Sequence, residues 1–221
     1  GFNTLEEDTL RKIKAALDET GLVCAATHES PDNLKQDPEA VIAKHRILDC
    51  AHTAIGGKWF DGPATAADWK AFCAEYNETV KPFQDAGIRV GYHNHSHEFQ
   101  ILEDGSRPID IMLEHLSGDI WFELDVYWVA HGLGDPAAWI RKIAATGANR
   151  LPCLHYKDGA VDHERHHLML PVGAGNLNWP EVNAAAAEAG VEWLLVERDS
   201  GPHDPFDALD ISISNLRGMG W

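Results

Sequence analysis

The segment GYHNHSHEF, residues 91–99, contains three imidazoles and a carboxylate, side chains suited to acid–base and metal chemistry. It follows residues 88–90, a short apolar run with β-branched side chains that is typical of a strand. Side chains alternate between the two faces of a strand, so we expect His93 and His95 to point the same way. Two such imidazoles can share a metal ion or bracket a polar substrate. The alternative interpretation is a solvated, histidine-rich loop.

Three later apolar runs also end in residues of the types that bind metal ions. They end in FELD at residues 122–125, LHYKD at residues 154–158 and VERD at residues 196–199. One candidate from each of four successive strands gives the set Glu98, Asp125, His155 and Glu197. Three carboxylates and one imidazole favour Mn²⁺ or Mg²⁺, with Co²⁺, Fe²⁺ and Zn²⁺ as further candidates. Such an ion would polarise a carbonyl and stabilise the enediolate that forms when a neighbouring proton is removed.

Further residues near these strand ends are candidates for contact with substrate: His28, Trp128, Lys157 and Asp199. Together with His93 and His95, His28 is also a candidate acid or base. Trp128 could stack on a sugar face or simply plug the rim of the fold. Either Lys157 or Asp158 could hold a substrate hydroxyl, although Lys157 could equally be an ordinary surface lysine. We expect Glu123, one pleat deeper than Asp125, to support the ligands from behind.

The elements that must position these residues alternate along the whole chain. Apolar strands are predicted at residues 22–28, 51–55, 120–126, 151–156 and 191–196, besides the strand that carries the histidine segment. Each is followed by an amphipathic helix, and residues 157–178 form a polar loop. Strict alternation predicts a parallel α/β sheet covered by helices, in which sites lie at the carboxyl ends of the strands. No GxGxxG motif follows a strand, so a dinucleotide site is not expected.

Composition narrows the classes of partner. Eighteen basic residues against 35 acidic ones give a formal charge of −17, which disfavours nucleic acids and anionic membranes. No stretch approaches the roughly 20 apolar residues that span a bilayer, and no signal peptide is visible. The four cysteines show no CxxC spacing, so we expect free thiols and a reducing, cytoplasmic location.

Several of these segments resemble the sugar phosphate isomerase/epimerase family. The resemblance rests on YHNH with EF, ELDVYW, HYKD, PVGAG and VERD, which occur in order over essentially the whole chain. It implies one xylose-isomerase-like TIM-barrel domain over residues 1–221. It also implies that Glu98, Asp125, His155 and Glu197 hold the divalent metal. Related branches place a glutamate nearer His93, so His93 is the alternative to Glu98 as first ligand.

By the same resemblance, the substrate is a sugar, a keto-sugar or a cyclitol. We find no glycine-rich or basic phosphate cradle and therefore expect an unphosphorylated substrate. The leading hypothesis is an isomerase or epimerase that transfers a proton next to a carbonyl. The runner-up is a lyase, either an inosose-type dehydratase or an enzyme that eliminates from 3-keto-glycosides. An apurinic endonuclease is disfavoured by the charge and by too few ligand histidines, and a catalytically silent binding protein is the fourth alternative.

The number of strands raises a separate expectation. A TIM barrel has eight strands and typically about 250 residues, whereas only six strand–helix units are predicted here. We therefore expect the first two barrel strands to be missing, with about 40 further N-terminal residues in the natural protein, the size of a strand–helix–strand unit. Otherwise a homo-oligomer or a companion chain would cover the bare edges at residues 22–27 and 191–196.

Overall fold

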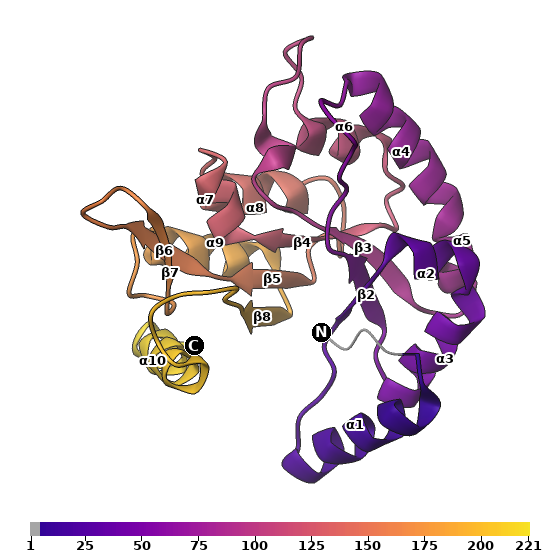
Figure 1. The fold of residues 1–221 in the computed structure, drawn as a ribbon, viewed down its shortest axis with the longest axis horizontal. Helices are drawn as coiled ribbons and strands as arrows, with labels where there is room; N and C mark the ends of the chain where they lie inside the picture. The colour runs from indigo at the N-terminus through magenta and orange to yellow at the C-terminus, as the bar shows by residue number, and fades with distance from the viewer. Residues whose placement is uncertain (1–4) are drawn as a thin grey trace. The chain divides into compact units, whose positions relative to one another are not determined.

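The computed structural model describes residues 5–221, in which strands and helices alternate as predicted (Figure 1). The first half contains α1 (Glu7–Thr20), β1 (Thr27–Glu29), α2 (Pro31–Gln36), α3 (Pro38–Leu48), β2 (His52–Ile55), α4 (Ala66–Thr79), α5 (Lys81–Asp85), β3 (Arg89–His93), the 3₁₀ helix η1 (His97–Phe99) and α6 (Pro108–His115). The second half contains β4 (Trp121–Asp125), α7 (Val126–His131), α8 (Pro136–Ala144), β5 (Cys153–Tyr156), β6 (Asp158–Val161), β7 (His167–Leu170), α9 (Trp179–Ala189), β8 (Trp193–Val196) and α10 (Pro205–Gly218).

Six of these strands form one sheet in the order β1-β2-β3-β4-β5-β8. The pairs β1/β2, β2/β3, β4/β5 and β5/β8 are parallel, as the alternation of strands and helices predicts. The α/β class and the six strand–helix units are therefore confirmed. No helix within residues 5–221 is long and apolar enough to cross a membrane.

The chain divides into two compact units. Unit 1 comprises the described residues up to His93 together with Ile101–Phe122. Its core contains an aromatic face of α4, on which Trp69, Phe72 and Tyr76 are buried. Gly91 in β3 is required by packing, because a Cβ atom there would lie 2.5 Å from the indole of Trp121. That indole donates a hydrogen bond from Nε1 to the carbonyl oxygen of Arg89, at 3.0 Å.

One prediction for unit 1 needs correction. The first strand was expected at residues 22–28, but β1 pairs with β2 only from Thr27 onward. Leu22 and Val23 are 62% and 65% exposed, so apolar residue types alone were misleading there. Further along unit 1, α4 ends at Thr79, and Pro82 lies in the first turn of the separate helix α5. Proline at that position lacks only an N–H that would be unpaired in any case.

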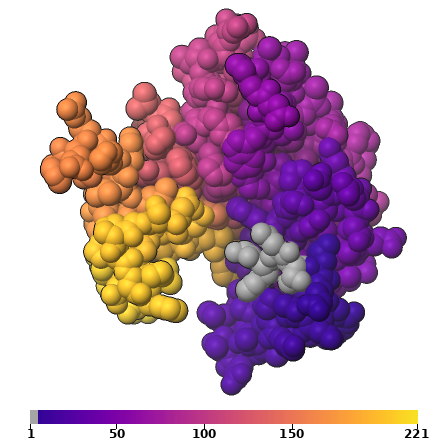
Figure 2. Space-filling model, viewed as in Figure 1, coloured from indigo at the N-terminus to yellow at the C-terminus, as the bar shows by residue number. Residues whose placement is uncertain are grey.

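Unit 2 comprises Asn94–Gln100 and Glu123–Trp221. The polar loop predicted for residues 157–178 is wrong in part, because it contains the antiparallel hairpin β6–β7 (orange in Figure 1). The short helix α7 was also missed: it directly follows β4, and the carboxylate of Asp125 caps it. Helix α10 (yellow in Figure 2) exposes apolar side chains such as Phe206 and Leu209.

Candidate functional site

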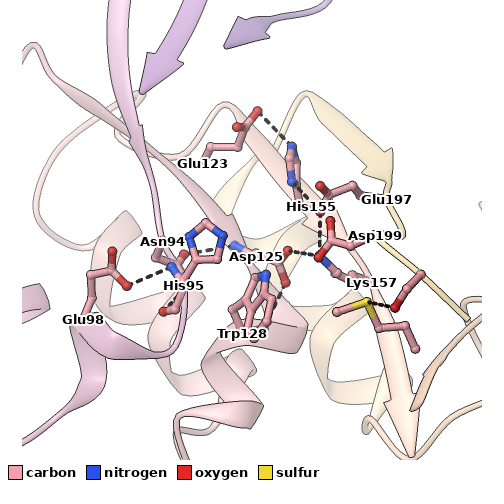
Figure 3. Close-up of polar contacts among 12 residues, drawn as sticks. Asn94, His95, Glu98, Glu123, Asp125, Trp128, His155, Lys157, Glu197 and Asp199 are labelled. Atoms are coloured by element: carbon pink, nitrogen blue, oxygen red, sulfur yellow. Dashed lines mark hydrogen bonds and ion pairs between the residues drawn. The ribbon is translucent and has the colours of Figure 1, made fainter. Parts of the chain in front are cut away.

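Asp125, His155 and Glu197 meet at the carboxyl ends of β4, β5 and β8 in unit 2 (Figure 3). The strand register explains the meeting, because Asp125 pairs with His155 and Tyr156 pairs with Val196, the residue before Glu197. Each of the three offers one ligand atom, and these atoms lie within 4.8 Å of one another. Sequence reasoning predicted these three as metal ligands, and the structure brings them together.

His155 lies between two carboxylates. Its Nε2 is 3.2 Å from Oε1 of Glu123, and its Nδ1 is 3.1 Å from Oε2 of Glu197. Burial opposes a positive charge on the imidazole, but the two carboxylates outweigh it and raise the pKa of His155 to about 10. Glu123, two residues before Asp125 on β4, thus holds the His155 ring in position, which is the supporting role expected for it.

Lys157 is the second cation of this cluster and is almost fully buried, so the surface-lysine alternative is wrong. Its Nζ donates hydrogen bonds to Asp199, at 2.6 Å, and to Glu197, at 3.1 Å. It also lies 3.6 Å from Oδ2 of Asp125 and 5.0 Å from the centre of the Trp128 ring. Burial would lower the pKa of Lys157, but Asp125, Glu197 and Asp199 raise it above its usual value.

Burial and the two cationic side chains also shift the pKa values of Asp125 and Glu197. Burial raises the pKa of Asp125 to about 7 in spite of Lys157 and His155. For Glu197 burial acts in the same direction, but His155 and Lys157 hold its pKa well below the usual range. Four carboxylates, those of Glu123, Asp125, Glu197 and Asp199, therefore share two cationic side chains. This excess of carboxylates favours the binding of a further positive charge.

The residues fit a divalent cation on two grounds. Oδ1 of Asp125 accepts a hydrogen bond from the backbone N–H of Trp128 at 3.0 Å, whereas its buried Oδ2 accepts none from the described residues. The ammonium of Lys157 lies 3.6 Å from this oxygen, beyond hydrogen-bond distance, so Oδ2 keeps the capacity to bind a cation that approaches more closely. The donor set of two carboxylates and one imidazole also suits the divalent ions predicted from the sequence.

Glu98, the fourth predicted ligand, is held by its own loop. Its Oε2 accepts a hydrogen bond from the backbone N–H of His95 at 2.8 Å, and its Oε1 lies 3.1 Å from Nε2 of His97. It does not belong to the group of three described above. Its role as a ligand stays a prediction.

The two candidate bases lie in different units. β3 ends at His93, so His95 lies beyond the strand and the rule of alternating faces does not apply to it. The His95 ring is 5.2 Å from that of Trp128, and burial, with His97 and Lys157, lowers the pKa of His95 to about 4. In unit 1, the ring of the buried His93 contacts that of His28 at 5.2 Å.

Sequence reasoning missed the supporting roles of two residues of unit 2, Asn94 and Asp158. Asn94 accepts a hydrogen bond from the backbone N–H of Asp125 at 3.0 Å and so ties the histidine segment to β4. Asp158, which was offered as a holder of a substrate hydroxyl, is fully buried, and its carboxylate accepts N–H groups of the loop 171–175 and of Trp179. The hydrogen bonds of Asp158 therefore hold this loop in place.

The family model described as xylose isomerase-like TIM barrel matches residues 1–218. No curated protein matches the chain. Among solved structures, the chain is similar to a sugar phosphate isomerase/epimerase from Parabacteroides distasonis, with a TM-score of 0.77 and 24% identity over 96% of this chain and 76% of that one.

Two further solved structures are similar in fold. The probable 3-DHS dehydratase AsbF from Bacillus anthracis has a TM-score of 0.70 and 12% identity, over 96% of this chain and 82% of that one. A D-allulose 3-epimerase from Methylomonas sp. has a TM-score of 0.63 and 16% identity, over 95% of this chain and 82% of that one. At these identities, the likeness concerns the fold.

Proposed function

Because the chain belongs to the xylose isomerase-like TIM barrel family, we propose that it is a divalent-metal-dependent isomerase or epimerase of an unphosphorylated keto-sugar. The observation that carries the proposal is the convergence of Asp125, His155 and Glu197 at three strand ends. These residues would hold the ion, with Glu98 or His93 as the candidates for a further ligand. When bound, Mn²⁺ or Mg²⁺ supplies polarisation of a carbonyl and stabilisation of an enediolate.

The other polar residues of unit 2 suit a proton transfer next to a carbonyl. A pKa of about 4 leaves the His95 imidazole unprotonated at neutral pH, so His95 can take a proton from carbon. Lys157 keeps its charge and can donate to a substrate oxygen, while its bonds to Glu197 and Asp199 fix its position. Trp128 contacts both His95 and Lys157 and offers an apolar surface against which a sugar could stack. His93, beside His28 in unit 1, is the second candidate base.

A lyase is the second candidate function. The similar dehydratase from Bacillus anthracis supports it, because dehydration can begin with the same proton abstraction and end with loss of a β substituent. Incubation with keto-sugars and 3-keto-glycosides in deuterated water separates the two reactions. Deuterium incorporation without loss of a group supports the isomerase or epimerase, and release of a leaving group supports the lyase.

Metal content after purification tests the ligand assignment. We expect Asp125→Asn to lose the bound divalent ion while the protein remains folded, because the change removes one ligand oxygen and no core volume. Asp162→Asn is the matched control, since Asp162 lies in a separate cluster of possible ligands with Glu164 and His166 on the β6–β7 hairpin. If Asp125→Asn keeps its metal and activity, or if only Asp162→Asn loses the ion, the assignment is wrong.

A further inference from the structure

Two of the four free cysteines lie side by side in unit 1. Cys24 is in the segment between α1 and β1, and Cys50 is in the short connection between α3 and β2. A hydrogen bond joins their thiol groups, and both side chains belong to the small apolar cluster that contains Leu10 and Leu48. The proposed function makes no use of either cysteine.

The strand register explains why the two thiols meet. β1 and β2 are parallel, and Thr27 pairs with Thr53. Cys24 and Cys50 each come three residues before these partners, so they hold equivalent places on the two segments that lead into the strands. Paired strands lie about 4.8 Å apart, and a disulfide suits Cα atoms about 4.4–6.8 Å apart. Because the thiols are already hydrogen-bonded to each other, joining them needs little movement of the backbone.

The two thiols differ in exposure and in reactivity. Cys24 is partly exposed, and the hydrogen bond with Cys50, helped by the charge of Lys44, lowers its pKa in spite of burial. Its thiolate therefore forms more readily and is open to a small oxidant. Cys50 is only 5% exposed, and its backbone N–H and carbonyl oxygen are both bonded to His45, at 3.0 and 2.8 Å. A shielded thiol held beside a reactive one is the arrangement of a resolving cysteine.

We propose that Cys24 and Cys50 are an oxidation site, at which hydrogen peroxide converts the pair into an intramolecular disulfide. The Cys24 thiolate attacks one peroxide oxygen, the O–O bond breaks, and Cys24 becomes a sulfenic acid as hydroxide leaves. The Cys50 sulfur then loses its proton and attacks the Cys24 sulfur, and the oxygen leaves as water. In total the two thiols give up two electrons and two protons, and one peroxide is reduced to two molecules of water.

The disulfide closes a loop over residues 24–50, which contains β1, α2 and α3. The pairing of β1 with β2 begins only at Thr27, and Leu22 and Val23 are exposed. A covalent link three residues earlier fastens this segment to the start of β2. Closing such a loop stabilises the fold mainly by restricting the unfolded chain, so oxidation should raise the Tm by about 5–10 °C.

The test oxidises the full chain with stoichiometric hydrogen peroxide, blocks the remaining thiols with N-ethylmaleimide and maps the peptides by mass spectrometry. Trypsin places Cys24 in residues 15–35 and Cys50 in residues 47–58, so the disulfide joins these two peptides until dithiothreitol separates them. We expect this linked pair in protein that runs as a monomer on a non-reducing gel. Peptides that stay unlinked, or that are linked only between two copies of the chain, overturn the proposal.

Two variants test the order of the steps. Cys50→Ser keeps a hydroxyl that can donate to Cys24, so Cys24 should stop at the sulfenic acid, which dimedone traps on residues 15–35. Cys73→Ala is the control and should form the linked pair, because Cys73 is buried on α4 and burial raises the pKa of its thiol to about 12.

The peptide map of the unchanged chain decides the linkage even where a variant does not fold. A dimedone adduct on Cys50 in Cys24→Ser, with none on Cys24 in Cys50→Ser, overturns the assigned order of attack. A Tm that does not change on oxidation overturns the fastening of the segment before β1.

Discussion

Asp158→Asn is the substitution whose cost can be worked out most directly from the structure. The carboxylate of Asp158 is fully buried. Its Oδ2 accepts N–H groups of Gly173, Gly175 and Trp179 at 2.9, 3.0 and 2.7 Å, and its Oδ1 accepts those of Gly159 and Leu177 at 2.8 and 3.4 Å. An asparagine can present its oxygen to only one of these two groups of donors.

The magnitude follows from that mismatch. With the amide oxygen in the Oδ2 position, three hydrogen bonds change from a charged to a neutral acceptor and lose about 1 kcal/mol each. The amide NH₂ then faces the N–H of Gly159, and a buried donor without an acceptor costs about 1–3 kcal/mol. We expect the free energy of unfolding to fall by about 4–6 kcal/mol, measured by urea denaturation with circular dichroism.

Asp162→Asn is the control for this prediction. Its carboxylate also accepts two backbone N–H groups, those of Glu164 and His166, but it does so in a largely exposed loop. There water can replace the lost bonds, so the expected cost is about 1 kcal/mol or less. If the two variants lose the same free energy of unfolding, Asp158 does not anchor the loop in the way described.

Three further outcomes are expected. His95→Ala should lower kcat by about 10²- to 10⁴-fold while metal content stays unchanged, as metal analysis and steady-state kinetics would show, and loss of metal would contradict its role as a base. Burial lowers the pKa of His45 in the folded protein below the ordinary value of 6.5, so only the unfolded state takes up this proton as the pH falls below 6.5. The free energy of unfolding should therefore decrease from pH 6.5 downward, and less steeply in His45→Gln; equal slopes would refute this. Iodoacetamide should modify Cys24 well before Cys73, as mass spectrometry of the labelled peptides would show. Burial raises the pKa of the Cys73 thiol to about 12, whereas a hydrogen bond with Cys50 helps to lower the pKa of Cys24. Modification of Cys73 first would contradict this prediction.

The order of strands and helices could be predicted because each element carries local signals. Asp135 followed by proline marks the start of α8, and the structure shows the Asp135 carboxylate accepting the N–H groups of Ala137 and Ala138. The ends of strands were less predictable, since pairing with a neighbour decides them. Leu22 and Val23 have the residue types of a strand, yet β1 finds its partner only at Thr27. The β6–β7 hairpin was missed because its pairing of Asp158 with Leu170 joins residues that show no local alternation.

The candidate ligands illustrate the same division. Asp125, His155 and Glu197 could be placed together because parallel strands bring equivalent positions to one edge. Glu98 could not be placed by that rule, because β3 has already ended at His93 and the turn of η1 directs the carboxylate back to the N–H of His95.

Lys157 and Asp158 show why adjacent residues of similar polarity could not be told apart from sequence. Lys157 lies among carboxylates contributed by β4 and by the segment after β8, which the strand register brings near. Asp158 instead accepts N–H groups from residues 15, 17 and 21 positions later, and no spacing rule links a strand residue to a loop at those distances. The segment PVGAG then has a physical explanation that the resemblance alone could not supply. Its glycines let the backbone approach the Asp158 carboxylate closely, since a Cβ atom at Gly175 would collide with that side chain. The loop is therefore held by Asp158, and of this pair only Lys157 stays a candidate for contact with substrate.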